Sequence, residues 1–146
     1  MALIYLDASV VVPFISPEPA RGAITTFLVD HGGDVIVSDF AAGEVASAIA
    51  RVVRMGGIDT EDGLGRLRWF DEWRLLQTLP CEILSADLRL ADAFVRRFEL
   101  KLRFPDAINI AICRRVGAAL ATLDQRTVLA AKSLDITLVS FAFTEG

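Results

Sequence analysis

Four acidic residues either interrupt apolar sequence or open a helical pattern: Asp7, Glu44, Asp106 and Asp124. Asp7 and Asp124 each close a short apolar run. In open α/β sheets, ligands bind outside the carboxyl ends of the strands, so residues that close such runs are candidates for a site. The sequence predicts that the four carboxylates meet at one edge of a sheet, without a lysine or histidine beside them.

Carboxylates brought close together repel one another, and one of them would be forced to take up a proton. A hard divalent cation such as Mg²⁺ or Mn²⁺ removes this penalty and prefers carboxylate and water oxygens. The cation would lower the pKa of a bound water, orient it and neutralise charge in the transition state of phosphodiester hydrolysis. The predicted chemistry is metal-dependent hydrolysis, with the four carboxylates as catalytic residues and metal ligands.

Each acid also has a structural explanation when it is taken singly. Asp106 in a first helical turn would complement the helix dipole, and Asp124 would cap a helix that follows a strand. Asp7 and Glu44 are harder to explain in this way, because a buried carboxylate is costly without a partner. The convergence of all four is what favours a functional site.

Four short apolar runs indicate strands covered on both faces: Leu3–Leu6, Val35–Val37, Ala119–Leu123 and Ile136–Val139. Glu82–Leu84 is a weaker fifth candidate. Helical spacing of apolar residues lies between the strands, over Pro19–Val29, Phe40–Met55, Leu64–Leu76, Leu88–Leu100 and Pro105–Val116, with Gly117 as a cap. The alternation predicts an α/β fold, a three-layer α/β/α sandwich around a central parallel sheet of four to five strands.

The chain has 146 residues, of which 53% are hydrophobic, and this is the size of one ordinary domain. We therefore expect a single domain over residues 1–146. No run approaches the ~18 uninterrupted apolar residues of a membrane span, and the N-terminus lacks the basic region of a signal peptide. A cytoplasmic protein with no membrane partner is expected.

The chain lacks the residues that are characteristic of several classes of protein. Cys81 and Cys113 have no CxxC spacing, which argues against a disulfide framework or a cysteine-built zinc site. His31 is the only histidine, and no GxSxG, GxxxxGK[ST] or GxGxxG motif is present. A net charge of −4 argues against coating nucleic acid by bulk charge, although thirteen of the fifteen cations are arginines, which bind phosphate well.

Four segments resemble, in order and spacing, the motifs of PIN domains: Leu6–Ser9, Gly43–Ala48, Pro105–Ala111 and Ala121–Asp124. With the chain length, the pattern is most similar to the VapC-type ribonuclease toxins of prokaryotic toxin–antitoxin pairs, and it runs from Leu3 to about Val139. The resemblance implies a parallel sheet flanked by helices and a metal-dependent endoribonuclease. It also implies a homodimer that a cognate antitoxin protein inhibits.

Carried over by position, the four acids match the acidic quartet of that family, with Asp7 and Asp106 as the foremost direct metal ligands. Ser9 matches a small hydroxyl residue that would bond a carboxylate or a metal-bound water, and Thr122 matches a hydroxyl residue that would orient the site. Asn109 lies one helical turn after Asp106 and would orient it.

Two positions differ from the family's pattern. Gly43 stands where Ser or Thr often precedes the glutamate, so one supporting hydroxyl is missing. Gln125 and Arg126 follow Asp124 where some members carry a further acid, which makes a site for two metal ions less well supported.

The expected substrate is single-stranded or looped RNA, such as a tRNA or rRNA loop, because its backbone is open to such a pocket. Arg51, Arg103 and Arg126 are candidates for phosphate contacts, with ordinary surface salt bridges as the alternative. Trp69 and Trp73 fall on one helix face, which favours core packing or a protein interface over RNA stacking.

Two other kinds of function are compatible with part of this pattern. Phosphotransfer domains also have an aspartate at the end of the first strand, and a binding module of the same fold could carry the same acids. A magnesium-dependent phosphatase would need a second acid in Asp7-Ala8-Ser9, and a phosphoacceptor domain would need a late lysine outside the helices, where Lys101 and Lys132 do not lie. A non-catalytic PIN-like binding module would use the acids only to recognise a partner.

Overall fold

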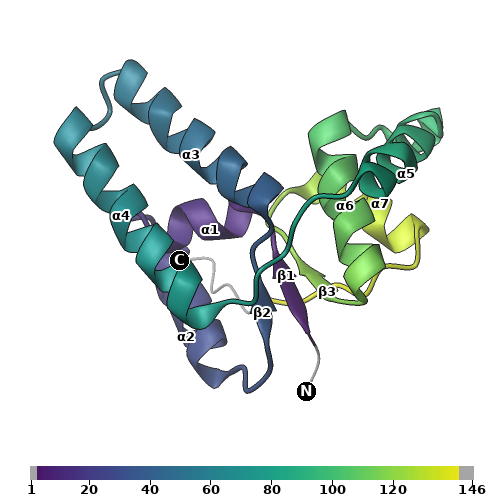
Figure 1. Ribbon diagram of the computed structural model, residues 1–146, viewed down its shortest axis with the longest axis horizontal. Helices are drawn as coiled ribbons and strands as arrows, with labels where there is room; N and C mark the ends of the chain where they lie inside the picture. The colour runs from purple at the N-terminus through teal and green to yellow at the C-terminus, as the bar shows by residue number, and fades with distance from the viewer. Residues whose placement is uncertain (1–2, 142–146) are drawn as a thin grey trace.

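The computed structural model describes residues 3–141, and at its centre lies a parallel sheet of three short strands. The strands are β1 (Ile4–Leu6), β2 (Val35–Ile36) and β3 (Ala119–Ala121), in the order β2-β1-β3 (Figure 1). Tyr5 pairs with Ile36 on one side and with Leu120 on the other. All three strands are fully buried, as expected of apolar runs in a parallel sheet.

The prediction of four to five strands is wrong for the described residues, because each edge of the sheet is extended only by a single bridge. Leu138 bridges to Leu120, whose backbone bonds Thr137 and Val139 at 2.8 and 2.9 Å, so the fourth expected run lies in place without forming a strand. At the other edge the bridging residue is Leu79, which pairs with Ile36.

The proposed strand Glu82–Leu84 does not form, because side chains take up its backbone groups. Arg115 Nη2 donates to the carbonyl of Glu82 at 2.8 Å, and the Leu84 N–H donates to Asp87 Oδ2 at 2.8 Å. Both arms of the Arg115 guanidinium also hold Asp87, whose side chain is almost fully buried. This bidentate pair anchors the segment as a loop.

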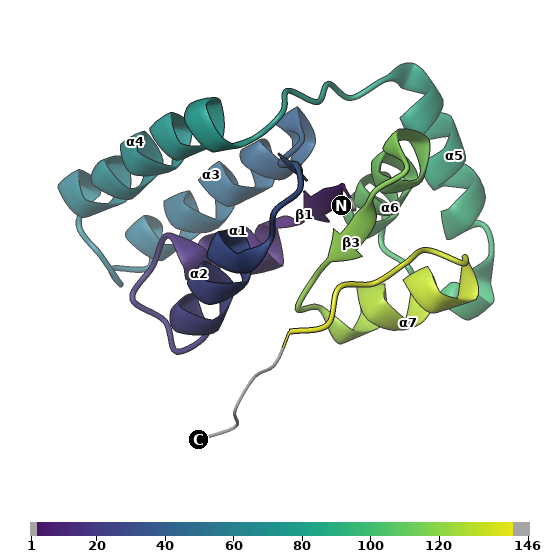
Figure 2. The ribbon, with the colours of Figure 1, turned by 90° about the horizontal axis from the view of Figure 1, so that it is seen from below.

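Helices cover both faces of the sheet, which confirms the three-layer α/β/α arrangement. One face carries α1 (Ala8–Phe14), α2 (Arg21–Asp30), α3 (Asp39–Arg54) and α4 (Thr60–Gln77). The other carries α5 (Ser85–Val95), the 3₁₀ helix η1 (Phe98–Leu100), α6 (Phe104–Val116) and α7 (Gln125–Ser133). Figures 1 and 2 show the two groups on opposite sides of the strands.

Two apolar cores result, one on each side of the sheet. Tyr5 of β1 belongs to the core beneath α5, α6 and α7, whereas its neighbours Ile4 and Leu6 belong to the core beneath α1 to α4. This alternation follows from the twofold side-chain period of a strand. Trp69 and Trp73 pack edge-on against Phe14 at ring distances of 5.4 and 4.9 Å. Core packing is confirmed for Trp73, whereas Trp69 is 47% exposed, so a protein interface at Trp69 stays a prediction.

The helix ends agree with the sequence pattern at some positions and differ from it at others. Gly117 ends α6 with φ +70°, as expected of a glycine cap. The pattern over Leu88–Leu100 is interrupted, since α5 ends at Val95 and only residues 98–100 continue as η1. Helix α1 is an element that periodicity did not predict, because three valines and Pro13 occupy a seven-residue helix. Within residues 3–141, no helix has both the length and the apolar character needed to cross a membrane.

Candidate active site

The carboxyl ends of the strands bring polar side chains to one edge of the sheet. Asp7 follows β1 directly, Thr122 follows β3, and Ser38 comes just after β2 and caps α3. The structure describes seven buried polar or charged residues, and four of them are linked to this edge: Asp7, Ser38, Asn109 and Thr122. Because burying polar groups is costly, such a concentration points to a site.

Asp7 is held in place by its neighbour Ser9. The Ser9 hydroxyl donates to Asp7 Oδ1 at 2.5 Å, and the Ser9 N–H donates to the same oxygen at 3.0 Å, so Asp7 also caps α1. The Ser9 hydroxyl oxygen accepts the Leu123 N–H at 2.8 Å and lies 3.3 Å from Thr122 Oγ1. Burial raises the pKa of Asp7, and hydrogen bonds from Ser9 and Thr122 oppose that rise. The expected contact between Ser9 and a carboxylate is thus present.

Glu44 is oriented by Asn109 from across the molecule. The Asn109 amide nitrogen donates to Glu44 Oε1 at 2.6 Å and to the Pro105 carbonyl at 3.3 Å. The expectation that Asn109 orients Asp106 is wrong, because its amide group turns towards α3 and bonds Glu44. Burial raises the pKa of Glu44, the bond from Asn109 lowers it, and the charges of Asp7 and Asp106 raise it further.

Tyr5 and Ser38 support this contact, and sequence reasoning missed both. The Tyr5 hydroxyl donates to Asn109 Oδ1 at 2.5 Å, so its only proton is used there and Ser38, at 2.7 Å, is the donor to Tyr5. A directed relay runs from Ser38 through Tyr5 and Asn109 to the Glu44 carboxylate. The available signal was the only tyrosine of the chain inside a buried strand, since a buried phenol needs a polar partner.

Asp106 and Asp124 form the other end of the site. Burial raises the pKa of Asp106, the charge of Asp124 raises it further, and Arg103 and Arg126 lower it. Arg103 Nε lies 3.7 Å from Asp106 Oδ2. Asp124 caps α7 by accepting the Arg126 N–H at 2.9 Å, as its position after a strand predicted. The Asp124 N–H donates to Thr122 Oγ1 at 3.2 Å, which ties this acid to the end of β3.

A match to a family model shows which family this chain belongs to. The family model of the PIN domain matches residues 4–139. The chain belongs to the PIN domain family. No curated protein matches the chain in sequence.

Several solved structures share the fold of this chain. Mycobacterium tuberculosis VapC20, a toxin described as cleaving the sarcin-ricin loop, gives a TM-score of 0.69 at 18% identity, covering 87% of this chain and 94% of its own. A chain of FitAcB from Neisseria gonorrhoeae gives 0.65 at 17% identity, covering 94% and 96%. A chain of Rickettsia felis VapBC2 bound to promoter DNA gives 0.63 at 12% identity, covering 94% and 97%.

The carboxylates of this PIN domain are coupled in pairs and do not form one tight cluster. Asp7 and Asp106 both act on Glu44, and Asp124 acts on Asp106. Among residues 3–141, however, no three His, Cys, Asp or Glu side chains are close enough to hold a metal ion. The physical reason is that like charges repel, while Ser9, Asn109 and Arg103 hold separate carboxylates by contacts of their own.

The donor set nevertheless fits a hard divalent cation in its chemistry. Carboxylate, hydroxyl and amide oxygens are the ligands that Mg²⁺ and Mn²⁺ prefer. Mg²⁺ keeps several waters and is bound through one or two protein carboxylates, so a coupled pair is sufficient. Burial is the main cause that raises the pKa values of Asp7, Glu44 and Asp106, and a bound cation would favour their charged forms.

Of the three arginines expected to contact phosphate, two lie at this edge of the PIN domain. Arg103 and Arg126 both act on the charge of Asp106. Arg51 lies in the last turn of α3, roughly 10 Å further along the helix axis than Glu44 at 1.5 Å per residue. Its role in RNA binding stays a prediction.

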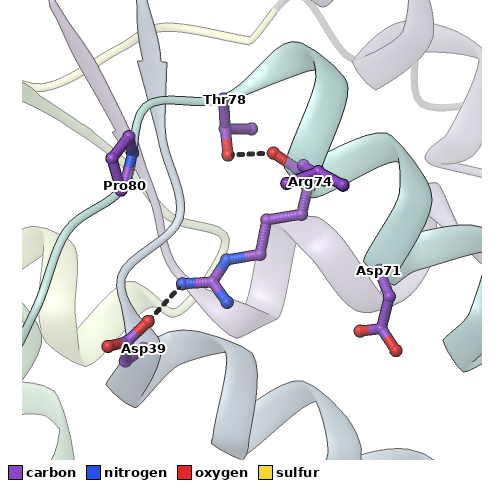
Figure 3. Close-up of a pocket in the computed structure, with 6 residues that line it drawn as sticks. Asp39, Asp71, Arg74, Thr78 and Pro80 are labelled. Atoms are coloured by element: carbon purple, nitrogen blue, oxygen red, sulfur yellow. Dashed lines mark hydrogen bonds and ion pairs between the residues drawn. The ribbon is translucent and has the colours of Figure 1, made fainter.

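A hollow of about 440 Å³ near the start of α3 shows how Glu44's helix is anchored (Figure 3). Arg74 of α4 donates through Nη2 to Asp39 Oδ1 at 2.7 Å and through Nε to the Val37 carbonyl at 3.0 Å. It therefore clamps the end of the β2 segment to the first residue of α3, on either side of Ser38. The hollow does not contain any of the four acids, and we treat it as a support for the site.

Proposed function

We propose that this chain is the toxin of a toxin–antitoxin pair and a metal-dependent endoribonuclease that hydrolyses RNA phosphodiester bonds. The observation that carries this proposal is geometric: at the carboxyl edge of a PIN-domain sheet, Ser9 holds the buried Asp7 and Asn109 holds Glu44. Burial also raises the pKa values of Asp7, Glu44 and Asp106. Carboxylates with perturbed pKa values that gather at one place are typical of catalytic sites.

The cation would be Mg²⁺ or Mn²⁺, with Asp7 and Asp106 as its foremost ligands and Glu44 and Asp124 beside them. When bound, such a cation supplies Lewis acidity, which lowers the pKa of a coordinated water and stabilises charge on the phosphate. Because the carboxylates must be deprotonated to bind it, we expect its affinity to increase with pH through their raised pKa values.

The chain's own residues would position the reacting groups. Ser9 fixes one oxygen of Asp7, and Asn109 fixes one oxygen of Glu44, so neither carboxylate is free to turn away. An acidic site repels RNA until a cation is loaded. Arg103 and Arg126 would offset this repulsion by contacting the phosphates of the substrate. All four acids would then be catalytic residues, with Ser9, Thr122 and Asn109 as their supports.

The substrate proposed is an exposed loop of tRNA or rRNA, which fits the description of VapC20 as cleaving the sarcin-ricin loop. An antitoxin partner is supported by the VapBC2 and FitAcB complexes among the similar structures. We also propose a homodimer, which the family resemblance implies.

The deciding experiment compares the parent protein with Asp7→Asn on a labelled stem-loop RNA. The parent should cut the loop with Mg²⁺ or Mn²⁺ and not with EDTA, and Asp7→Asn should cut at least about a hundredfold more slowly, in the range expected for loss of a key charged group. Asp71→Asn, which alters an exposed acid on α4, is the matched control and should cut normally.

Three outcomes would overturn the proposal. Equal cutting by the parent and Asp7→Asn would indicate a contaminating nuclease. Release of phosphate from a small phosphoester without RNA cleavage would indicate a phosphatase. RNA binding without cleavage under any divalent cation would indicate a non-catalytic PIN-like module.

A further inference from the structure

A small pocket lies between η1 and α7, next to the acidic site. Its volume is about 200 Å³, below the roughly 300–1,000 Å³ of pockets that enclose drug-sized ligands. Leu100 of η1 and Leu129 and Ala130 of α7 provide its apolar lining. Its size therefore suits a flat group such as a single nucleobase.

Arg126 links the pocket to the candidate site. The Arg126 side chain lines the pocket and its charge lowers the pKa of Asp106, while the backbone N–H of Arg126 donates to Asp124 Oδ1. Ser133, two turns further along α7, marks the far end of the pocket. A group bound in this pocket would lie beside α7, further from the four acids than Arg126.

The charge around the pocket favours a nucleotide. Lys101 and Arg126 are both exposed and line it. Glu99 is the one acid in the lining, and its charge is paired with Arg97 at 3.0 Å. A polyanion would therefore meet Lys101 beside an apolar surface, together with Arg126, whose charge also acts on Asp106 at the neighbouring site.

The segment that forms one wall also exposes aromatic rings. Phe98 is 84% exposed and Phe104 is 43% exposed, and they lie at the two ends of a seven-residue stretch that also contains Lys101 and Arg103. Exposed aromatic rings interleaved with cations are the composition of surfaces that bind single-stranded nucleic acid, because bases stack on the rings while the cations follow the backbone.

We propose that this pocket receives one base of a single-stranded RNA, close to the phosphodiester bond that is cut, and so contributes to the choice of cleavage position. This inference rests on the proposed ribonuclease function. It adds a nucleobase subsite built from Leu100, Lys101, Arg126, Leu129 and Ser133.

The test is an abasic scan. A set of single-stranded RNA oligonucleotides lacks one base at each position around the cut, and both cleavage by the parent and binding by the inactive Asp7→Asn protein are measured. Removing the base that occupies the pocket should weaken both by at least about fivefold, the lower end of what stacking one base contributes. Removing bases at distant positions should change neither.

Leu129→Asp tests the pocket itself, because it replaces an exposed apolar wall residue on α7 by an anion. It should weaken cleavage of the intact RNA by a similar factor and abolish the sensitivity to the abasic position. Leu76→Asp makes the same change at a leucine on α4 that is 68% exposed, similar to Leu129, and should behave like the parent. Ser133→Trp, which fills the pocket from an exposed position, provides a second variant if Leu129→Asp fails to fold.

Failure of the pocket and failure of the ribonuclease are distinguishable. Metal-dependent cleavage with no sensitive position, or a sensitivity that survives in both pocket variants, would overturn the subsite and leave the ribonuclease intact. Absence of cleavage by the parent, with the abasic effect still present in binding, would overturn the ribonuclease and retain the subsite.

Discussion

The Tyr5 hydroxyl donates to Asn109 Oδ1 across 2.5 Å, joining residues 104 positions apart in the chain. This contact fixes which way the Asn109 amide points, because its oxygen is turned to the phenol and its nitrogen therefore faces Glu44. A residue in the middle of the central strand thus sets the orientation of a carboxylate on α3, without touching it.

Tyr5→Phe should reduce activity by removing this orientation. The ring still fills its site, but the Asn109 oxygen loses its donor, so the free energy of unfolding should fall by about 1–3 kcal/mol. If Glu44 is catalytic, kcat for RNA cleavage should fall roughly tenfold with little change in KM, since about 1.4 kcal/mol of positioning energy is lost from the transition state. Denaturant unfolding and steady-state cleavage measure the two effects.

Thr127→Val is the matched control for this substitution. The Thr127 hydroxyl is buried in the first turn of α7 and has no hydrogen-bond partner in the described structure, so its removal should leave stability unchanged or raised. Normal kcat in Tyr5→Phe would show that the relay is not needed to position Glu44.

Asp7→Asn should stabilise the metal-free protein at neutral pH. Burial raises the pKa of Asp7 in the folded state, so the fold binds this proton more tightly than the unfolded chain does. The resulting stability is fully present below the ordinary aspartate pKa of about 3.9 and is lost as the pH rises through the raised pKa. Asparagine keeps the acceptor for Ser9 and stays neutral throughout.

Denaturant unfolding in EDTA from pH 3.5 to pH 8 measures this effect. The stabilities of parent and Asp7→Asn should converge at the acid end and separate as the pH rises, with the variant more stable. Asp71→Asn should follow the parent at every pH. A separation that shrinks towards pH 8 would contradict a raised pKa for Asp7.

Divalent cation should raise the melting temperature of the parent. The coupled carboxylates repel one another without it, so a cation binds the folded state in preference to the unfolded chain. At a hundred times Kd the gain is about 2.7 kcal/mol, which corresponds to roughly 5–10 °C for a domain of this size. Thermal unfolding with Mg²⁺ and Mn²⁺ checks this. Asp106→Asn should lose most of the shift while Asp71→Asn keeps it, and an equal shift in both would place the cation elsewhere.

The fold was largely predictable, because it follows from local patterns that do not depend on distant partners. The apolar runs before Asp7 and before Thr122 became central strands, and the glycine at 117 ended a helix as expected. The segment around Glu82 does not form the predicted strand, because Arg115 and Asp87 bond its backbone groups, and the local sequence does not indicate such long-range contacts.

The sequence selects candidate acids for a site, but it does not predict the contacts that these acids make. Asp7, Glu44 and Asp106 can be selected because burying a carboxylate is costly, and an acid within apolar sequence can be recognised from the sequence alone. The partner of Asn109 was not predictable, because helix spacing points to Asp106 whereas the fold places Glu44 within 2.6 Å. Asn109 thus bonds a residue 65 positions away in the chain and not the acid one helical turn before it.

Substitution of the arginines should separate those that meet RNA from those that do not. Arg103 and Arg126 lie beside Asp106. If one of these arginines binds a phosphate, changing it to alanine should reduce the salt dependence of RNA binding. The slope of log K against log salt should flatten by about 0.7 per lost contact with a single strand. Arg51→Ala removes the same charge from the last turn of α3, about two turns beyond Glu44, and its slope shows whether that helix also contacts RNA.

Anisotropy titrations of a labelled RNA with the inactive Asp7→Asn protein, loaded with Mg²⁺, provide the measurement. Unchanged slopes for both Arg103→Ala and Arg126→Ala would show that these guanidinium groups only offset the charge of Asp106, and the phosphate contacts would have to be sought elsewhere.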